Sequence, residues 1–512
     1  MFAKLTSGAV LGIDAVQIEV QCDVSGGLPV FNVVGLPEKE VSESRERIRS
    51  AIKNCGLSFP AGRITANLAP ADLKKEGVGL DLPIAMAILA ASGQMPLPDR
   101  QYCMLGELAL NGDVCGVRGV LPISLGVGSD VDGMIVPADN AAEAAAGADV
   151  PVYPVATLAE ARRFLCGEID IAPYRIDRST LLDRGSADVE HDLTVVRGQT
   201  LAKRAVEVAA AGGHNLLMIG PPGSGKSLLA RCLPDLLPPL TFEEAIEVTR
   251  IYSSAGALEK GASIVKRRPF RAPHHTVSYA GMVGGGHGIP GPGEISLADH
   301  GVLFLDELPE FDRRVLETLR QPLEDRTILL SRAGCSVRYP AAFTLVAAMN
   351  PCPCGYLGDL LRPCVCSLYD VRRYRKRLSG PFLDRIDMFV EVPRLTVEEL
   401  FTRSAGEASA IVRERVAVAR ATQWERLIAV PTCFSNAQLD GKLIDEHCRL
   451  SDEAGLLLRR AVSRFGLSAR AHVRVLRIAR TIADLEGCAE LAAPHIAEAI
   501  QYRSCGEALG EH

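Results

Sequence analysis

The chain alternates short runs of apolar, β-branched residues with stretches that place apolar side chains every three or four positions. The first kind of run predicts strands and the second predicts amphipathic helices. Early in the chain, two strands and two helices are predicted in this way: 30–34, 133–137, 42–53 and 82–91. This mixture is typical of an α+β domain, which we expect to cover residues 1–170. Residues 171–190 are polar and charged, which predicts a linker.

The middle of the chain has the order that opens a parallel α/β sheet. A helix is predicted at 200–211, then a buried strand at 215–219, a glycine-rich loop and a helix from Lys226. We expect this domain to cover residues 191–395. Residues 396–512 show mostly helical periods, which predicts a separate C-terminal helical domain. Its predicted helices are 397–416, 451–465, 469–485 and 493–502.

The loop after the strand at 215–219 matches the pattern G-x-x-x-x-G-K-[ST] of phosphate-binding loops. It consists of Gly220, Pro221, Pro222, Gly223, Ser224, Gly225, Lys226 and Ser227. Its glycines let backbone N–H groups turn toward phosphate oxygens, at the positive end of the following helix. Lys226 would neutralise the β- and γ-phosphates of ATP, and Ser227 would ligate Mg²⁺.

Two further strands carry polar residues at their ends. The apolar run 302–305 ends at Asp306 and Glu307, and the run 344–348 is followed by Asn350. We expect Asp306 to hold Mg²⁺ through water and Glu307 to polarise the attacking water. Asn350 could position that water against the γ-phosphate. Together these residues predict a P-loop ATPase core of the AAA+ kind, a ring-forming class.

Composition agrees with a large protein that does not enter membranes. Of 512 residues, 47% are hydrophobic, yet no apolar run reaches the length of about 18 residues that a membrane-spanning helix needs. No secretory signal is evident and the cysteines are irregularly spaced, so we expect a cytoplasmic protein. The net charge of −6 hides an asymmetry. Residues 1–190 have 16 basic and 25 acidic side chains, whereas residues 191–395 have 25 basic and 21 acidic ones.

Four of the fifteen cysteines lie close together in a C-x-C-x9-C-x-C pattern: Cys352, Cys354, Cys364 and Cys366. Two close pairs joined by a loop can bind Zn²⁺ with tetrahedral thiolates. A structural zinc site, reduced free thiols and a redox switch remain open at this point. The adjacent His274 and His275 could likewise be metal ligands, or part of a structural or DNA-contacting loop.

Three basic stretches of the middle domain could contact DNA. The first is 266–271, with the glycine-rich segment 284–288 behind it. The second is a predicted β-hairpin, 327–330 and 337–343, with Arg332 at its tip, and the third is 372–377. Basic loops of this kind follow a phosphate backbone without recognising sequence. Each stretch could instead be a solvated or ATP-facing surface.

Several segments resemble one family across essentially the whole chain. They are 196–199, 209–216, 268–275, 292–298, 319–324, 350–355 and 379–387. They resemble the magnesium-chelatase-like AAA+ ATPases of the YifB/ComM competence protein family. The resemblance implies a hexameric, ATP-driven DNA helicase that promotes branch migration in homologous recombination during natural transformation, acting on single-stranded or branched DNA. The alternative is a chelatase-type motor subunit that remodels a partner protein for metal insertion.

The same resemblance assigns two arginines. Arg385 stands where the family places an arginine finger that reaches the ATP of a neighbouring subunit, although a local ion pair with Asp384 or Asp387 is the simpler alternative. Arg470 stands where the helical lid contributes a second sensor. Arg474, one turn later, is a rival for that role, and an exposed helix arginine is the simpler alternative for Arg470.

Within the first domain, residues 75–83 and 106–114 resemble the Lon protease domain, which uses a Ser-Lys dyad. Aligned on these segments, the serine position is Gly79 and the lysine position is Leu121. Neither residue can perform the chemistry. The resemblance therefore implies a Lon-protease-like fold without peptidase activity.

Overall fold

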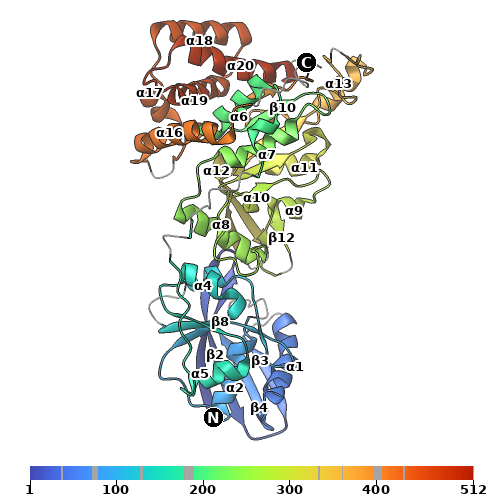
Figure 1. The fold of residues 1–512 in the computed structure, drawn as a ribbon. Coiled ribbons are helices and arrows are strands. Elements are labelled where there is room, and N and C mark those ends of the chain that lie inside the picture. The colour runs from blue at the N-terminus through green and yellow to red at the C-terminus, as the bar shows by residue number, and fades with distance from the viewer. Residues whose placement is uncertain are drawn as a thin grey trace.

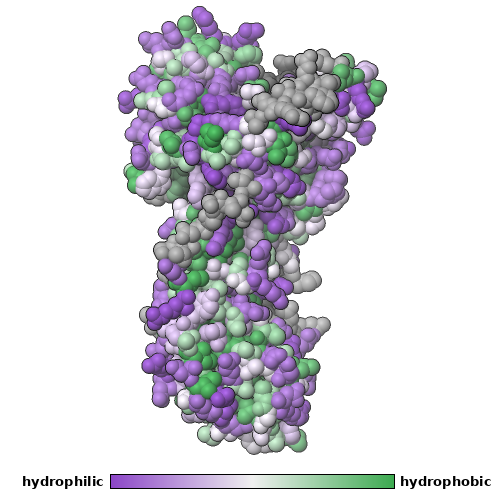
Figure 2. All heavy atoms as spheres, viewed as in Figure 1, coloured by the Kyte–Doolittle hydropathy of each residue, from purple (hydrophilic) through white to green (hydrophobic). Residues whose placement is uncertain are grey.

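The computed structural model describes residues 1–35, 39–71, 79–126, 131–177, 181–182, 190–286, 288–332, 335–359, 361–395, 406–430 and 433–510. It shows an elongated molecule, with the N-terminal sheet at one end and the C-terminal helices at the other (Figure 1). In a space-filling view the two ends form separate lobes, and the upper one is the broader (Figure 2). No helix of the described residues is long and apolar enough to cross a membrane.

The N-terminal part is built on a mixed sheet. Within the described residues its strands lie in the order β3 (Val30–Val34), β4 (Arg63–Ala69), β2 (Asp14–Ser25), β1 (Phe2–Leu11), β5 (Tyr102–Met104), β8 (Gly133–Pro137) and β9 (Val152–Val155). β1, β2 and β4 are antiparallel, whereas β5, β8 and β9 run parallel to β1. The predicted strands at 30–34 and 133–137 are confirmed with the same bounds.

Helix α2 (Asp81–Ala91) lies in the core of this part, and every one of its side chains is buried. This burial explains why its sequence is apolar on all sides, which is the pattern that predicted a helix at 82–91. The predicted helix at 42–53 is confirmed as α1 (Lys39–Asn54). The other elements of this part are β6 (Glu107–Leu108), β7 (Val114–Cys115), α3 (Val120–Gly126), α4 (Ala141–Gly147) and α5 (Leu158–Leu165).

The second sheet is parallel throughout. Among the described residues its order is β11 (Phe270–Arg271), β14 (Val302–Leu305), β17 (Thr344–Met349), β10 (Leu216–Ile219) and β18 (Met388–Glu391). The predicted strands at 215–219, 302–305 and 344–348 are confirmed to within a residue. β10 comes first along the chain but lies between β17 and β18. Its carboxyl end is therefore a switch point of the sheet, where ligands bind in open α/β folds.

Helices surround this sheet, and two short hairpins project from it. The helices before residue 300 are α6 (Thr200–Gly212), α7 (Lys226–Leu236), α8 (Phe242–Ala255), α9 (Tyr279–Val283) and α10 (Glu294–Leu297). Those after it are α11 (Arg313–Thr318), α12 (Pro322–Asp325), α13 (Leu368–Arg375) and α14 (Gly380–Leu383). The hairpins are β12 (Gly284–Gly285) with β13 (Gly291–Pro292) and β15 (Thr327–Arg332) with β16 (Cys335–Pro340). The predicted hairpin is therefore present, although Ala333 and Gly334 at its tip lie outside the described residues.

The C-terminal helices are α16 (Ser409–Leu427), α17 (Gly441–His447), α18 (Asp452–Phe465), α19 (Ala469–Leu485) and α20 (Ala493–Gly510). α18 and α19 agree with the predictions, and α20 begins where expected but runs eight residues further. Of the predicted helix 397–416, residues 397–405 lie outside the described residues, and α16 begins only at Ser409. The predicted end at Val416 is wrong, because α16 continues to Leu427 without a helix-breaking residue. These helices share one hydrophobic core with α6, α7 and one face of the second sheet.

Helix α8 joins the N-terminal part to the part built on the second sheet. Arg250 of α8 donates to the carbonyl oxygen of Ile13, in the turn between β1 and β2, and forms an ion pair with Asp14 at the start of β2. Ser253 donates to the buried carboxylate of Glu143, at 2.5 Å. Apolar side chains of α3, α4 and α8 complete this junction.

Candidate nucleotide-binding site

The phosphate loop connects β10 to α7 at the switch point of the second sheet. Gly223 and Gly225 have φ angles of 75° and 94°, a backbone conformation that favours glycine and lets the loop curl. The Lys226 ammonium lies inside this curl, where it donates to the carbonyl oxygens of Gly220 and Pro221 at 2.8 and 2.9 Å. Burial lowers the pKa of Lys226, an effect that the nearby Asp306 opposes. The lysine is thus held where the phosphates of a nucleotide would enter.

The two predicted magnesium ligands lie together. Ser227, at the start of α7, donates its hydroxyl hydrogen to Asp306 Oδ2 at 2.7 Å. Asp306 follows β14, and its other carboxylate oxygen accepts from the backbone N–H of Glu307 at 2.9 Å. Hydroxyl and carboxylate oxygens are the ligands that Mg²⁺ prefers, so this pair fits the ion. When bound there, Mg²⁺ would bridge and neutralise the phosphate oxygens.

Glu307 has a φ of 51°, a conformation that a non-glycine residue adopts only when its surroundings impose it. Its carboxylate is largely exposed and lies 3.6 Å from Nδ1 of His275. The exposed carboxylate is free to face a water beside the phosphates. The His274–His275 pair therefore lies beside the predicted catalytic glutamate, an arrangement that the sequence did not predict.

Asn350 and Gln199 complete the surroundings of the loop. The amide oxygen of Asn350, after β17, lies 3.5 Å from the Lys226 ammonium. Gln199 donates from its side-chain amide to the carbonyl oxygens of Ser224 and Pro393, at 3.3 and 2.6 Å. It thus ties the phosphate loop to the segment after β18. Sequence reasoning missed this role, because Gln199 is distant in the chain and carries no motif beyond the family segment 196–199.

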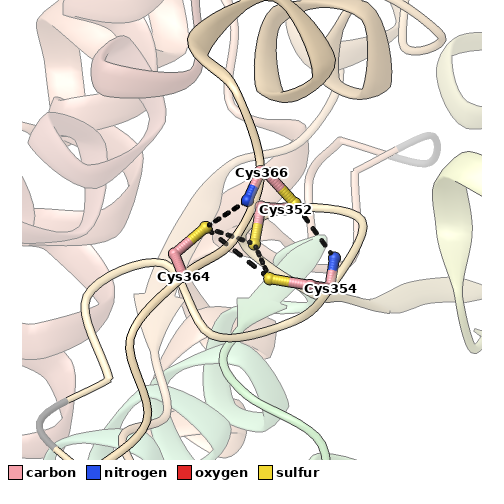
Figure 3. A group of neighbouring side chains, drawn as sticks. All are labelled: Cys352, Cys354, Cys364 and Cys366. Atoms are coloured by element: carbon pink, nitrogen blue, oxygen red, sulfur yellow. Dashed lines mark hydrogen bonds between the residues drawn. The ribbon is translucent and has the colours of Figure 1, made fainter.

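The four cysteines also come together (Figure 3). The sulfurs of Cys352, Cys354 and Cys364 lie 3.4 to 3.6 Å apart, and all four sulfurs lie within 4.8 Å of one another. A tetrahedral zinc–thiolate site with bonds of about 2.3 Å requires sulfurs roughly 3.8 Å apart. Backbone hydrogen bonds from Tyr356 and Val365 lower the pKa of the Cys354 thiol to about 6, which favours the thiolate that binds metal. The cluster therefore fits a structural zinc ion.

This cysteine knuckle, residues 352–366, packs against the phosphate loop. Gly355 has a φ of 85°, and a Cβ atom there would lie only 2.6 Å from Cδ of Pro222. The knuckle also begins two residues after Asn350. Its fold therefore bears directly on the position of two parts of the nucleotide site.

The two predicted arginines lie away from the phosphate loop of their own chain. Arg385 precedes β18 and therefore lies at the amino-terminal end of the parallel strands, whereas the phosphate loop lies at their carboxyl end. The Arg385 side chain pairs with Glu324 at 2.8 Å and is about one-tenth exposed. Arg470 is exposed near the start of α19. Its rival Arg474 donates to the carbonyl oxygen of Ile386, also just before β18. In this chain neither Arg385 nor Arg474 reaches the phosphate loop.

Gly79 lines a cavity of about 660 Å³ between the N-terminal sheet and α8. The cavity walls also include Gly8, Arg118, Pro290 and Tyr339. A Cβ atom at Gly79 would meet Val117 only at an ordinary 3.7 Å, so the position has room for a side chain but presents none. Leu121 is fully buried. Residues 75–78 of the Lon-like segment lie outside the described residues.

The phosphate loop, the serine–aspartate pair and the carboxylate after β14 define a P-loop nucleotide-binding protein. Three family models match the chain: Magnesium chelatase, subunit ChlI, at residues 192–400; Subunit ChlI of Mg-chelatase at 20–140; and Magnesium chelatase, subunit ChlI C-terminal, at 406–503.

The matching relatives include proteins of nearly equal length. Competence protein ComM of Haemophilus influenzae is 46% identical over 507 residues, which cover 98% of this chain and 97% of that protein. YifB of Escherichia coli is 45% identical over 505 residues, again 98% of this chain and 97% of the relative. The magnesium-chelatase 67 kDa subunit of Heliobacterium mobile is 28% identical over 195 residues, 33% of this chain and 29% of that protein.

The chain therefore belongs to the magnesium-chelatase-like AAA+ family, together with the ComM and YifB proteins. Membership implies ATPase activity that uses ATP and Mg²⁺.

Proposed function

We propose that this protein is an ATP-driven DNA motor, a hexameric helicase that promotes branch migration during homologous recombination of incoming DNA. The observation that carries the proposal is the 46% identity, over nearly the whole chain, to a competence protein. The clustered Lys226, Ser227, Asp306 and Glu307 supply the ATPase site that such a motor needs. In this site Lys226 binds the β- and γ-phosphates, and Glu307 accepts a proton from the attacking water.

Part of the basic surface supports DNA binding. Arg373, Lys376 and Arg377 of the α13 region join Arg313 around a cavity of about 420 Å³. Among these four cations, Arg377 pairs with Glu310 at 2.5 Å. Such an excess of positive charge in a concave surface suits the phosphates of a nucleic acid.

The hairpin tip supports DNA binding as well, whereas the stretch 266–271 does so only in part. Arg332 is exposed and donates to the carbonyl oxygen of Gly286, so the two predicted DNA loops lie side by side. By contrast, Arg268 and Arg271 are used inside the protein, paired with Glu244 and Glu294 at 2.9 and 2.7 Å. The expectation that these two arginines contact DNA is therefore not supported by their environment.

Self-association into a ring is supported by the position of the predicted arginines and by the exposed surface near the nucleotide site. Because Arg385 lies at the end of the strands opposite its own phosphate loop, it would contact the ATP of a neighbouring subunit, once its ion pair with Glu324 is broken. We assign Arg470 the separate role of the second sensor contributed by the helical lid. The cysteine knuckle and the start of α13 expose large apolar side chains: Leu361, Val365, Leu368 and Tyr369. Such a patch is typical of an interaction site.

The proposal includes three further parts. The protein acts in the cytoplasm, on single-stranded or branched DNA and without sequence specificity. Residues 1–170 form a Lon-protease-like domain without peptidase activity, since Gly79 offers no nucleophile and Leu121 no base. Residues 171–190 form the linker, 191–395 the ATPase core and 396–512 the helical lid.

The test is ATP hydrolysis with and without single-stranded, forked and four-way-junction DNA, followed by junction movement. We expect DNA to stimulate hydrolysis, and Lys226→Ala to lower the hydrolysis rate by about 100-fold or more. Arg332→Glu with Lys376→Glu should weaken DNA binding and reduce its salt dependence. Arg459→Glu with Arg460→Glu, the same charge change on the exposed surface of α18, serves as the control.

A second candidate is a chelatase-type motor subunit that remodels a partner for metal insertion. It is favoured by the family models, whose descriptions name magnesium chelatase. If no DNA structure changed the rate of ATP hydrolysis and a porphyrin-pathway partner were captured, this function would be supported and the DNA motor rejected.

A further inference from the structure

A second cluster of metal-ligating side chains lies away from the nucleotide site, where α8 meets the turn before β14. Glu247 of α8 and Asp299 and His300 of the turn each present one ligand atom, and these atoms lie within 4.8 Å of one another. Nε2 of His300 is 2.7 Å from Oε2 of Glu247 and 3.6 Å from Oδ2 of Asp299. Because the turn precedes β14 and Asp306 follows it, the two sites lie at opposite ends of the same strand.

Asp299 is fully buried, yet only one of its two carboxylate oxygens accepts a hydrogen bond from the described residues. Oδ1 accepts from the backbone N–H of Ala342 at 2.6 Å. Oδ2 is inaccessible to solvent and accepts no hydrogen bond from any described residue. A buried carboxylate oxygen without a donor is costly and rare, and such a group is expected to have a further partner. The free oxygen faces Nε2 of His300, into the cluster.

His300 is oriented from its other side. Its Nδ1 lies 3.4 Å from Oε1 of Glu244, and Glu244 is itself held by Arg268 at 2.9 Å. Histidines that ligate metals nearly always donate their second ring N–H to a carboxylate or carbonyl, which fixes the ring and the tautomer. Glu244 stands in that position and leaves Nε2 directed at Glu247 and Asp299.

The charges of the cluster point the same way. Glu244, Glu247 and Asp299 are carboxylates, and Arg268 with a protonated His300 offsets only two of them. A divalent cation bound to a neutral His300 would cancel the charge of all three carboxylates together with Arg268. Neutrality matters most at Asp299, which is fully buried, because uncompensated charge is most costly where water is excluded; the Glu247 side chain is about 40% exposed.

We propose that Glu247, Asp299 and His300 form a site for a divalent transition-metal ion, with water as the fourth ligand and with zinc as the best fit to one imidazole and two carboxylates. Ligands at about 2.1 Å in a tetrahedron lie roughly 3.4 Å apart. The 3.6 Å between Nε2 of His300 and Oδ2 of Asp299 is close to this spacing. Oε2 of Glu247, now 2.7 Å from Nε2 of His300, would have to move about 0.7 Å further from it. The ion would tie α8, which carries the contacts to the N-terminal sheet, to the strand that delivers Asp306. This site does not depend on whether the protein acts on DNA.

The test is the zinc content of the full-length protein after removal of metal with a chelator and reconstitution with excess Zn²⁺. Asp299→Asn keeps the oxygen that Ala342 uses and removes the free one, and Glu247→Gln removes a second ligand. We expect each variant to bind one equivalent less zinc than the unmodified protein, whatever the cysteine knuckle holds. Glu243→Gln, an exposed neighbour on α8, should keep the full content. Equal zinc in all four proteins would overturn the proposal.

Cobalt titration of the unmodified protein gives a second measurement that requires no variant. Cobalt in the cysteine knuckle produces sulfur-to-metal charge-transfer bands, whereas cobalt bound by one imidazole and two carboxylates produces only d–d bands. The proposal expects a tightly bound equivalent of the second kind. Its absence under conditions that fill the cysteine knuckle would show a plain ion-pair cluster instead.

Discussion

At the scale of single residues, His214 shows how the nucleotide strand is anchored. It precedes β10 and is fully buried, and its Nε2 lies 2.8 Å from the hydroxyl of Thr481 in α19. Burial lowers the pKa of His214 to about 4, which makes the neutral ring the native form at physiological pH. This polar contact joins the start of the phosphate-loop strand to the C-terminal helices.

This environment predicts an acid-sensitive contribution to stability. The unfolded chain takes up a proton at the ordinary histidine pKa of about 6.5, whereas the folded chain resists protonation until about pH 4. The contribution is therefore complete above pH 6.5 and is lost as the pH falls to 4. With about 1.4 kcal/mol per pKa unit, it amounts to about 3 kcal/mol. We expect His214→Gln to remove this part of the pH dependence in denaturant unfolding measured at pH 7, 5.5 and 4.5.

The comparison needs a histidine that lies in a different environment. His472→Gln, at a partly exposed position of α19, should leave the pH profile parallel to that of the unmodified protein. Parallel profiles for the His214 and His472 variants would contradict the assigned role of His214.

At the scale of elements, the cysteine knuckle links a metal site to the phosphate loop. Gly355 and Gly358 lie in the same knuckle and have similar φ angles, 85° and 81°. A Cβ atom at Gly355 would collide with Pro222, whereas one at Gly358 would meet no described atom within 4 Å. Alanine would therefore introduce a similar backbone strain at either position, but only at Gly355 would it also press on the nucleotide site.

We expect Gly355→Ala to weaken ATP binding by about tenfold, because one inserted methyl group in a packed contact costs about 1–3 kcal/mol. Titration of the purified protein with a fluorescent ATP analogue measures this change. Zinc content should stay the same, since the cysteines are untouched.

Gly358→Ala carries the same backbone strain and should bind ATP within twofold of the unmodified protein. Equal losses in both variants would show that strain in the knuckle, rather than its contact with Pro222, affects the site.

At the scale of the whole molecule, α8 is the structural link between the N-terminal sheet and the ATPase core. Ser253 donates to Glu143, whose carboxylate also accepts from the backbone N–H of Leu121 at 3.0 Å. Among the described residues, the hydroxyl of Ser254 donates only within the helix, to the carbonyl oxygen of Arg250. Of these two neighbouring serines, Ser253 makes a hydrogen bond across the junction, whereas Ser254 makes one inside α8.

We expect Ser253→Ala to destabilise the protein by about 1–3 kcal/mol, because a hydrogen bond to a buried carboxylate is lost. Hydrogen exchange should quicken in α3 and α8 together, while β10 stays protected. Ser254→Ala should change the free energy of unfolding by less than about 0.5 kcal/mol. Faster exchange confined to α8 in the Ser253 variant would contradict a role in joining the two parts.

The charge distribution also belongs to this scale. The excess acid counted over residues 1–190 contrasts with basic surfaces at Arg332 and around α13. In the proposed ring, an acidic end and basic inner loops would hold DNA where ATP is hydrolysed. The count of basic residues in 191–395 overstates the charge available to DNA, because Arg268 and Arg271 form ion pairs within the protein.

The sequence by itself determined the elements whose chemistry is local. The phosphate loop, the strands at 215–219, 302–305 and 344–348, and helices α18 and α19 follow from glycine conformations, apolar periods and capping serines, which act within a few residues. For the same reason the sequence could place Asp306, Glu307 and Asn350 at strand ends.

Only the tertiary structure decided which distant groups meet. Four contacts bring together residues that are 25 to more than 100 positions apart or lie in segments without a motif. They are Gln199 with the phosphate loop, Gly355 with Pro222, His275 with Glu307, and the cluster of Glu247, Asp299 and His300. Such contacts depend on the order in which β10, β14 and β17 are laid side by side and on where α8 docks. No local pattern encodes that order, because it results from the burial of the whole core.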